Sequence, residues 1–549
     1  MALTTEATVT MTGKNQQISG PLVSVLISTY NRPRYVREAV ASILRQTYPN
    51  FEIILVRDGG APVGDIAGEF GDERLIFIDR DRNHGLPYSF NEALSRAKGE
   101  YVTYLGDDDI YYPNHIDVLV DALKGREQYG VAYSDLYKVN CCVTEDGRRV
   151  ALSKNVEISR DFSRMTMLRF NHTLHVSLIH DRLLLERAGG YNEELNVLVD
   201  WDLTRKLVFY TDFLHVPRIT GEFYAPVPVN SEQTCYSTPA GDCDRISVKQ
   251  RGDVSEFIRN MLTIRSTRPP KPWPKVEDMS LILLTERLDE ATEEALRDIW
   301  SHTFYPCQIY LPLPQEDLSR LRTVVPNILG VPVSAGSSET QRVDTALECC
   351  EGDYVAIVPR DFEIGREDMP WIESALQPLM NCDDTNQAFE LPASSSHCRA
   401  AVFRREQLRR ARRLGGHLGL AESVAAAGIR LRKPAVEEYP LQFDNLMTGA
   451  QEIEKQGDWA RAAEVFEYLA RNYQNELWMK TRWANALYHA GQYEHAARIV
   501  GRVNSKRPTV STLLLEARAR RKKEDIRGAI DLLEKAKQVL EGSELAWTL

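Results

Sequence analysis

Residues 22–56 have the sequence LVSVLISTYNRPRYVREAVASILRQTYPNFEIILV, and this stretch decides the fold class. It opens with a short β-branched apolar run at 22–28, continues with apolar side chains at helical spacing over 34–45, and closes with a second apolar run at 51–56. A strand, a helix and a strand in this order are typical of parallel strands joined by a crossover helix. We therefore expect the N-terminal part of the chain to be an α/β domain.

The same alternation continues beyond residue 56. Apolar runs at 75–78 and 101–105 flank a stretch with helical spacing at 89–97. Apolar runs separated by helices favour a mostly parallel sheet that helices cover on both faces. The sequence thus predicts one such domain over 21–264, preceded by a polar leader at 1–20.

The composition of the whole chain is that of a soluble globular protein. Its 549 residues correspond to three or four domains at about 150 residues each, and its 43% hydrophobic and 26% charged residues exclude global disorder. The formal net charge of -11 argues against a broad nucleic-acid-binding surface. The nine cysteines include no Cys-x-x-Cys motif, so we expect reduced, structural thiols and no thiolate zinc site.

Neither a membrane-spanning segment nor a signal peptide is expected. No apolar run approaches the roughly 18 residues that a membrane-spanning helix needs, and the polar leader lacks an apolar signal-peptide core. We therefore expect a cytoplasmic protein and leave open a peripheral position at the inner membrane.

After the first domain the chain changes character. The segment 265–276 is basic and proline-rich, which predicts a linker. The following residues repeat the first domain: a shift of 256 places the first strand-helix-strand unit on 280–311 without a gap, and a shift of 253 places 93–102 on 346–355. We expect a second, duplicated α/β domain over 277–440, and chance matching of apolar residues is the alternative.

The last part of the chain, 441–549, is rich in Ala, Glu, Arg and Leu at helical spacing. A glycine and an aromatic residue followed by Ala, at 457–462, recur 34 residues later at 491–496. This pattern resembles the tetratricopeptide repeat, a helix-turn-helix unit of about 34 residues whose stacked copies form a concave groove. An ordinary helical bundle is the alternative.

The strongest chemical signal lies at 99–113, where the sequence is GEYVTYLGDDDIYYP. An apolar strand runs directly into Asp107, Asp108 and Asp109. Three adjacent carboxylates repel one another unless a cation or hydrogen-bond donors offset their charge, and the carboxyl ends of strands are where open α/β sheets bind ligands. Hard oxygen ligands suit Mg²⁺ or Mn²⁺. A solvated acidic turn is the alternative.

At this point the chain resembles the family-2 glycosyltransferases, which have the Rossmann-like GT-A fold. The matching blocks occur in the family's order at 23–33, 42–56, 83–113 and 186–203, together with Asp58. The resemblance implies transfer of a sugar from a nucleotide-sugar donor, with inversion at the anomeric carbon. It implies a uracil-type base and hence a UDP-sugar.

The resemblance also implies three sets of site residues. The donor contacts are Ser28, Thr29, Tyr30, Asn31, Asp58, Asn83, Gly85, Asn91 and Asp107. The cofactor, Mn²⁺ or Mg²⁺, is expected on Asp108 and Asp109, where it would neutralise the diphosphate. The general base is expected at Asp200, which matches the aspartate of the family's E-D-W motif.

A physical argument supports the role of Asp200. Inversion in one step needs a base opposite the leaving diphosphate, and partial burial beside Trp201 would raise the basicity of a carboxylate. An N-cap role at a helix start is the alternative and is compatible with catalysis. On the acceptor side we expect Trp201, His172 and His175, with a core position as the alternative for the two histidines.

The chain departs from the family pattern at several positions. Arg57 and Val199 stand where the family often has acidic residues, and the motif that contains Asp108 begins with Gly106. Many members also have a histidine after the domain that helps to bind metal or diphosphate, whereas 221–229 contains none. The first three departures each weaken one predicted contact and leave the rest of the site intact. The missing histidine is the more serious departure, because metal binding is then expected to be weaker unless His172 or His175 reaches the site.

The second domain lacks the predicted chemistry. With the shift of 256, Asp58 corresponds to Pro314. With the shift of 253, the three aspartates at 107–109 correspond to Arg360, Asp361 and Phe362. We expect Arg360 to pair with Asp361 in place of a cation, and the domain to keep the fold without catalysis. Glu422, the residue nearest to a base there, is not expected to act as one.

The sequence as a whole predicts a metal-dependent inverting glycosyltransferase with one active domain, one inactive copy and a helical-repeat module. Because tetratricopeptide units bind peptide segments, the acceptor is predicted to be a protein, for example a bacterial surface or flagellar protein. One alternative is a lipid-linked or polysaccharide acceptor, with the repeats joining an assembly complex. Another is a non-catalytic scaffold or carbohydrate-binding protein, against which the retained carboxylates argue.

Overall fold

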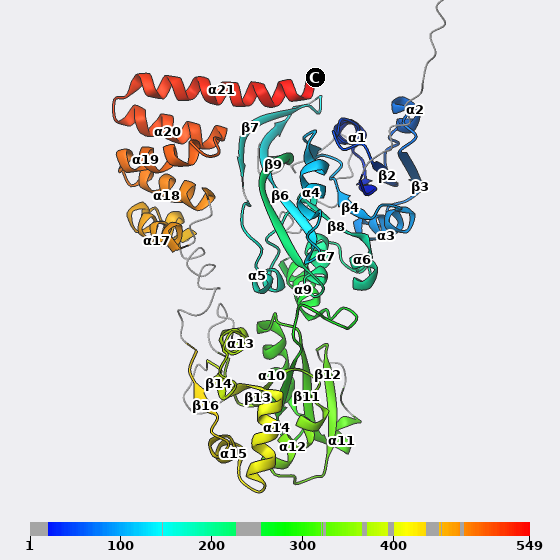
Figure 1. Ribbon diagram of the computed structural model, residues 1–549, viewed down its shortest axis with the longest axis vertical. Helices are drawn as coiled ribbons and strands as arrows, with labels where there is room; N and C mark the ends of the chain where they lie inside the picture. Colours follow the sequence, from blue (N-terminus) through cyan, green and yellow to red (C-terminus); the bar gives the residue numbers. More distant parts are fainter. Residues whose placement is uncertain are drawn as a thin grey trace, which may run out of the picture.

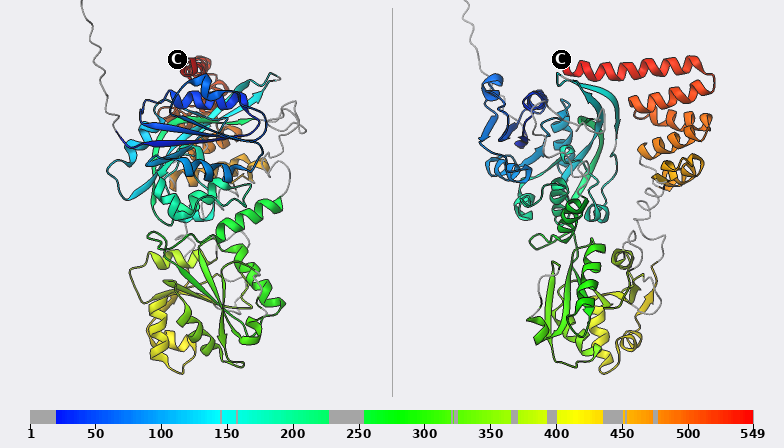
Figure 2. Two further views of the ribbon diagram at one scale, coloured as in Figure 1. Left: turned by 90° about the vertical axis from the view of Figure 1, so that its right-hand side faces the viewer. Right: turned by 180° about the vertical axis from the view of Figure 1, so that it is seen from behind.

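The computed structural model contains two α/β units, one above the other, and a column of helices that stands beside the first unit (Figure 1). Figure 2 shows the same three parts from the side and from behind. The structure describes residues 20–144, 146–156, 158–226, 254–319, 321, 325–364, 371–392, 400–434, 450–451, 453–472 and 477–548. The predicted polar leader therefore lies outside the described residues, apart from Gly20.

The first unit is built on a nine-stranded sheet. Its strands are β1 (Val23–Thr29), β2 (Phe51–Asp58), β3 (Leu75–Arg80), β4 (Tyr101–Tyr104), β5 (Ile110–Tyr111), β6 (Tyr129–Val143), β7 (Arg149–Val156), β8 (Leu178–Asp181) and β9 (Asp212–Pro226). Their order is β3-β2-β1-β4-β8-β6-β9-β5, with β7 paired to β6. Strands β1 to β4 run parallel, whereas β8 is antiparallel to both of its neighbours.

Helices cover the sheet and connect its strands. They are α1 (Pro33–Leu44), α2 (Ile66–Phe70), α3 (Leu86–Arg96), α4 (His115–Leu123), α5 (Arg164–Arg169), α6 (Arg182–Ala188), α7 (Val199–Leu207), α9 (Val254–Ser266) and the short 3-10 helix η1 (His175–Ser177). Each strand and helix that the sequence predicts between residues 22 and 105 is present within a few residues of its expected bounds. The prediction of a mixed α/β unit is confirmed.

Both faces of the first sheet are buried because alternate residues of each strand point to opposite sides. On β1, Val25 and Ile27 belong to the apolar layer shared with Ile43 of α1, whereas Leu26 belongs to the layer that contains Trp201. The three β1 side chains have no exposed surface. A strand buried on both faces needs a continuous apolar run, which explains the pattern at the start of the chain.

The second unit has a seven-stranded sheet. Its strands are β10 (Met279–Leu284), β11 (Cys307–Pro314), β12 (Ile328–Val333), β13 (Tyr354–Pro359), β14 (Gln387–Glu390), β15 (Ala401–Arg404) and β16 (Arg430–Arg432). Its helices are α10 (Glu290–His302), α11 (Gln315–Leu318), α12 (Glu339–Cys349), α13 (Ile372–Met380), α14 (Arg405–Gly415) and α15 (Leu420–Ala426).

The two sheets share their strand order and their register. The order β12-β11-β10-β13-β15-β14-β16 repeats β3-β2-β1-β4-β8-β6-β9 with the same parallel and antiparallel pairings. Val23 pairs with Phe51 as Met279 pairs with Cys307, so both partners differ by the predicted shift of 256. The β4 and β13 partners of these first strands differ by the predicted shift of 253.

A close approach of one loop to the first strand recurs in both units. Gly99 N donates to Ser24 Oγ at 2.9 Å, and Gly352 N donates to Ser280 Oγ at 3.0 Å. A Cβ atom on either glycine would lie 2.6 Å from the backbone nitrogen of its serine. Both positions therefore exclude any side chain, and the two units repeat the same local geometry.

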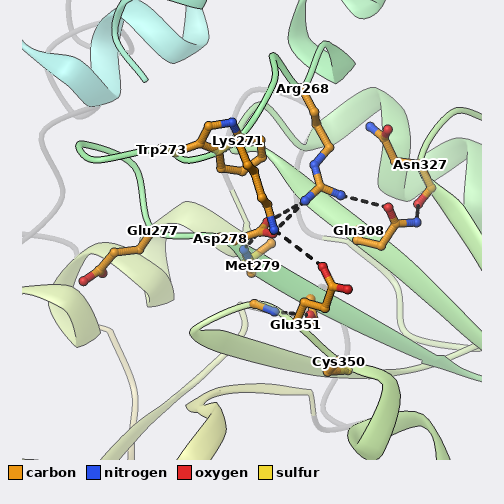
Figure 3. A network of polar contacts seen from close by, with 12 residues as sticks. Arg268, Lys271, Trp273, Glu277, Asp278, Met279, Gln308, Asn327, Cys350 and Glu351 are labelled. Carbon is orange, nitrogen blue, oxygen red and sulfur yellow. Dashed lines mark hydrogen bonds and ion pairs between the residues drawn. The ribbon is translucent and has the colours of Figure 1, made fainter. Parts of the chain in front are cut away.

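The predicted linker at 265–276 is not a free spacer, because its first residues end helix α9 and the rest is bound to both units. Arg268 donates two hydrogen bonds of 2.8 Å to Asp278 and a third to Gln308, and Lys271 Nζ lies 2.6 Å from the same aspartate (Figure 3). Toward the first unit, Trp273 packs against Phe209 with ring centroids 4.8 Å apart. The basic side chains that predicted a linker pair with a partly buried carboxylate instead.

The C-terminal helices form the column beside the first unit. They are α17 (Trp459–Asn472), α18 (Leu477–His489), α19 (Tyr493–Asn504), α20 (Val510–Lys522) and α21 (Ile526–Thr548). The turn between α19 and α20 reaches the first unit, where Arg507 pairs with Asp135 and Ser511 Oγ donates to Lys154 O at 3.2 Å. Among the residues that the structure describes, no helix has the length and apolar character needed to cross a membrane.

Candidate active site

The acidic turn follows β4 at the carboxyl ends of the parallel strands. Asp107 accepts hydrogen bonds from Thr29 Oγ1, at the end of β1, and from Arg32, both at 2.8 Å. The same Arg32 nitrogen lies 3.2 Å from Asp108. One guanidinium thus offsets part of the charge of two neighbouring carboxylates, and the turn is tied to the end of β1.

Asp109 turns away from the other two carboxylates. Its Oδ1 accepts a 3.0 Å hydrogen bond from the backbone N–H of Tyr224 on β9, and its Oδ2 lies where a side chain at Gly106 would be, 2.3 Å from the Cβ position. Gly106, where the family motif has an acidic residue, therefore leaves room for Asp109. In the segment that lacks the expected histidine, the Tyr224 backbone holds the turn.

Burial controls the charge of this turn. The side chains of Asp107 and Asp109 are buried, and desolvation raises the pKa of both carboxyl groups, although Arg32 opposes the shift at Asp107. Asp108 keeps 14% of its side chain exposed. Crowded carboxylates with raised pKa values fit a bound cation, and Asp108 is the one that faces outward.

The described residues contain no group of three or more His, Cys, Asp or Glu side chains placed to hold a metal ion. A cage made of protein alone is therefore not present in this part of the chain. The carboxylates of the acidic turn fit instead a hard divalent ion that is held by one or two of them. Substrate phosphate and water would complete its coordination, as is usual for Mg²⁺.

Arg149 on β7 is a site residue that the sequence did not reveal. It donates to the carbonyl oxygen of Asp108, pairs with Glu38 at 2.5 Å, and lies over the rings of Tyr224 and Tyr35 at 3.7 and 4.6 Å. A side chain held in this way fixes the acidic turn through its backbone. No local motif marks Arg149, because the β6-β7 hairpin carries it to the turn from about forty residues away.

The ends of β1 and β2 form a second wall of the site. Asn31 has a left-handed backbone, with φ 59°, and its Oδ1 accepts a 2.6 Å hydrogen bond from Ala61 N. A Cβ at Gly60 would lie 2.3 Å from this oxygen and 2.8 Å from the ring of Tyr30. Tyr30 and Ser28 are partly exposed here. These contacts bring Tyr30 and Asn31 together beside the loop at Gly60, and Ser28 precedes them at the end of β1.

Asp58 has a different set of partners from those predicted. Its two oxygens accept hydrogen bonds from the backbone N–H groups of His84 and Gly85, at 2.9 and 2.8 Å, and from Arg80 at 3.0 Å. The carboxylate is 2% exposed. Asp58 therefore anchors the loop that contains Gly85, and its contact with the nucleotide-sugar donor stays a prediction. Asn83, in the same loop, has a buried amide oxygen without a partner among the described residues.

Asn91 also turns away from the expected donor contact. Its amide donates to Tyr191 O at 3.1 Å and to Glu193 at 2.8 Å, and its oxygen accepts from Tyr191 N at 2.9 Å. Asn91 thus fastens α3 to the loop before α7. The structure assigns it to the support of the segment that carries Asp200.

Asp200 lies in the first turn of α7 and accepts hydrogen bonds from the Asn171 side chain and from backbone N–H groups at the start of the helix. Asn171 Nδ2 donates to Asp200 Oδ2 at 2.8 Å. Burial raises the pKa of Asp200, whereas the hydrogen bonds that it accepts lower it. A partly exposed carboxylate with a raised pKa is suited to accept a proton.

Of the three residues predicted on the acceptor side, Trp201 and His172 are packed inside the unit, whereas His175 is partly exposed and its role at the acceptor stays a prediction. Trp201 is 2% exposed and donates to Met167 O at 2.8 Å, so it supports α7 from within. His172 is also 2% exposed, and burial lowers its pKa to about 3, which favours the core alternative. His175 bonds to the hydroxyl of Tyr191 at 2.8 Å and stacks on Tyr104, and burial lowers its pKa to about 3.

The corresponding end of the second sheet is filled differently. Buried Arg342 of α12 donates to Thr285 O at 3.2 Å and to Pro312 O at 2.7 Å, at the ends of β10 and β11. The expectation that Arg360 pairs with Asp361 is wrong, because its ion pair in the described part of the chain is to Asp289 at 3.3 Å. The physical reason is that Asp361 points outward and is exposed.

Comparison with known proteins supports the first unit as a glycosyltransferase domain. Residues 24–187 match the family model described as glycosyl transferase family 2. An uncharacterised glycosyltransferase of Rickettsia felis is 32% identical over 213 residues, which cover 36% of this chain and 33% of that protein. Chondroitin synthase of Pasteurella multocida is 30% identical over 207 residues, which cover 36% of this chain and 20% of the synthase.

Among solved structures, TarS of S. aureus in complex with UDP-GlcNAc is similar with 21% sequence identity and a TM-score of 0.33, over 44% of this chain and 66% of that chain. The matched part of this chain spans about a third or less of the length of the Rickettsia felis protein and of chondroitin synthase. The family match ends before Asp200, so the role proposed for this residue rests on the motif at 199–201 and on its geometry.

Proposed function

We propose that the first unit is an inverting glycosyltransferase that moves a sugar from a nucleotide-sugar donor, of the UDP-sugar type, to an acceptor hydroxyl. The observation that carries the proposal is the acidic turn at the carboxyl ends of β1 and β4, with a partly exposed Asp108 between two buried carboxylates. The match of residues 24–187 to glycosyl transferase family 2 supports it. The partly exposed residues Tyr30 and Asn31 border the proposed donor pocket.

In the proposed reaction Asp200 acts as the general base. The acceptor oxygen attacks the anomeric carbon and forms the new glycosidic bond, the bond from this carbon to the diphosphate oxygen breaks, and the acceptor proton passes to the Asp200 carboxylate. Asn171 orients the carboxylate through its Oδ2. The raised pKa of Asp200 strengthens it as a base.

The proposed cofactor is Mn²⁺ or Mg²⁺. Asp108 would hold it, with Asp107 positioned by Thr29 beside it and Asp109 fixing the turn. When bound, the ion supplies charge neutralisation for the leaving diphosphate. Arg32 and Arg149 keep the turn in place from the protein side.

For the rest of the chain, we propose a duplicated GT-A-like domain without catalysis and a tetratricopeptide-like module. The shared strand order and register of the two sheets support duplication. Arg342, which fills the strand ends of the second sheet, supports the loss of nucleotide binding there. Six described cysteines are free thiols, which supports a reducing, cytoplasmic location.

Two acceptor classes follow from different observations. The helical column beside the first unit supports a protein acceptor, bound through the repeats. The likeness to chondroitin synthase and hyaluronan synthase of Pasteurella multocida supports a polysaccharide acceptor. Two assays distinguish these acceptor classes. A glycan that can be released from a modified protein indicates a protein acceptor, whereas sugar transfer to oligosaccharides indicates a polysaccharide acceptor.

The direct test is a screen of nucleotide sugars by thermal shift, with and without Mn²⁺, followed by assay of nucleoside diphosphate release. A donor that binds only the folded protein raises the melting temperature according to its concentration relative to its dissociation constant. We expect a metal-dependent rise for one class of donor, and diphosphate release with the same donor. The absence of both effects with every nucleotide sugar would refute the proposed function.

A further inference from the structure

Helix α7 is joined to the second α/β unit by the buried side chain of Arg205. This residue lies just over one turn after Asp200 on the same helix and is 1% exposed. Its guanidinium donates to four backbone carbonyls, which are Leu168 O at 3.2 Å, Arg265 O at 2.5 Å, Thr267 O at 2.8 Å and Phe304 O at 3.1 Å. A buried cation is costly unless its donors are satisfied, so these four acceptors define one position for the side chain.

The acceptor from the second unit is itself held in place. Phe304 follows α10, and the backbone N–H groups of Phe304 and Tyr305 both donate to Glu373 Oε1 at 2.9 Å. Glu373 belongs to α13 and has no exposed surface. The second unit therefore presents the Phe304 carbonyl to Arg205 from a fixed turn.

Apolar packing makes this junction continuous. Trp201 and Leu207 of α7 belong to the same cluster of buried side chains as Phe304 and Trp371 of the second unit. Interfaces of this apolar kind restrict relative motion of the parts that they join. The second unit thus forms part of the core on which α7 rests.

The same contacts lead to the side chain that orients Asp200. The end of α5 is fixed twice, because Leu168 O accepts from Arg205 and Arg169 O accepts from Arg265 at 3.2 Å. Asn171 lies two residues after the end of α5 and donates to Asp200. Arg205 therefore holds both the helix that carries Asp200 and the segment that carries its hydrogen-bond donor.

We infer that the second α/β unit positions the general base of the first unit, and that Arg205 is the positioning residue through which it does so. The inference rests on the proposed function of Asp200. Arg205 touches neither donor nor acceptor in this account, and it acts by fixing α7 and the end of α5. A unit without its own chemistry thereby contributes to the turnover of its neighbour.

The test compares Arg205→Lys with Arg268→Lys in the full-length protein. Lysine keeps the charge but cannot reach four carbonyls, so the hold on α7 is weakened. Arg268 serves as the matched control because it directly follows Thr267, whose carbonyl accepts from Arg205, and its own ion pair is to Asp278 of the second unit, without a contact to α7. Turnover, donor dissociation constant and the pH dependence of the rate are measured for each variant.

We expect Arg205→Lys to lower kcat by about 10- to 100-fold, with the donor dissociation constant unchanged and the acid limb of the pH profile moved to higher pH. Arg268→Lys should match the wild type in all three. A folded Arg205→Lys protein with wild-type kcat would overturn the inference. Should this variant fail to fold, Arg265→Met decides by the same measurements, because it removes the side-chain bond to Arg169 O at the end of α5 and leaves Arg205 in place. Its kcat should fall with the donor dissociation constant unchanged, and a wild-type kcat would overturn the inference.

Hydrogen exchange gives a readout that needs no activity. Amides of residues 199–207 should exchange faster in Arg205→Lys than in the wild type and in Arg268→Lys, whereas amides of β1 and β2 should not change. Equal exchange in all three proteins would overturn the inference. A wild-type protein without transferase activity, but with the expected exchange pattern, would instead refute the proposed function and leave the structural link in place.

Discussion

Replacing Asn171 by Ala should shift the pH dependence of sugar transfer. Asn171 Nδ2 donates to Asp200 Oδ2 at 2.8 Å, and this bond favours the charged carboxylate, whereas burial favours the protonated form. Without the donor, the pKa of Asp200 rises further. A hydrogen bond to a charged group contributes about 1.5–3 kcal/mol, and one pKa unit corresponds to about 1.4 kcal/mol, so the pKa should rise by about one to two units.

The sign of the effect on activity follows from the role of the base. A base must be deprotonated to accept the acceptor proton, so a higher pKa moves the acid limb of the kcat/KM profile to higher pH by the same one to two units or so. Activity should fall most at low pH and recover as the pH rises above the new pKa. The rate of nucleoside diphosphate release is measured across the acid limb for the wild type and for the variant.

The control is Asn140→Ala, which removes an amide of the same size whose partners are Ser153 and Asn155 on β7. Its acid limb should coincide with that of the wild type. An Asn171→Ala limb that stays in place, or that moves to lower pH, would refute the assignment of Asp200 as the titrating base.

Asp108→Ala should abolish metal-dependent donor binding while the protein stays folded, and calorimetric binding in Mn²⁺ at wild-type affinity would contradict the metal assignment. Asp361→Ala should leave transfer rates unchanged because this carboxylate is exposed in a unit that we propose to be inactive, and a clear loss of rate would give that unit a role in chemistry. Arg507→Met should destabilise the protein by about 1–3 kcal/mol, because Asp135 is buried and loses a charged partner. Denaturant unfolding identical to the wild type would contradict this last expectation.

The fold could be predicted where the sequence signal is continuous along one element. Strands β1, β2 and β4 are buried on both faces, so their apolar runs stand out, and the gapless shifts between the two halves anticipate the register that the two sheets share. The connecting segment was harder to predict. Its basic and proline-rich composition suits a spacer, whereas Arg268 and Lys271 find a carboxylate partner that only the folded second unit provides.

The site could be predicted in its residue types but only partly in their contacts. Asp107 and Asp200 lie where the motifs suggest, at a strand end and a helix start. Asp58 and Asn91 fit the pattern of the family equally well, yet they bind loops that the tertiary fold brings to them. Arg149 arrives from a distant hairpin, and no spacing rule identifies such a contact.

The sequence also could not predict which of the residues assigned to the acceptor side point into the core. Trp201 directly follows Asp200 in α7, but a helix turns successive side chains by about 100° and so points them in different directions. Trp201 therefore points into the core, although Asp200 before it stays partly exposed. Proximity along the chain does not decide which side chains reach the site.

The most direct test of the central claim is the Asp200→Asn variant, measured for donor binding and for turnover in the same preparation. The amide keeps the size of the carboxylate but cannot take the acceptor proton, so turnover should fall by about 10²–10⁴-fold while the donor dissociation constant stays at the wild-type value. Turnover close to that of the wild type, with donor binding intact, would contradict the account and move the base to another residue.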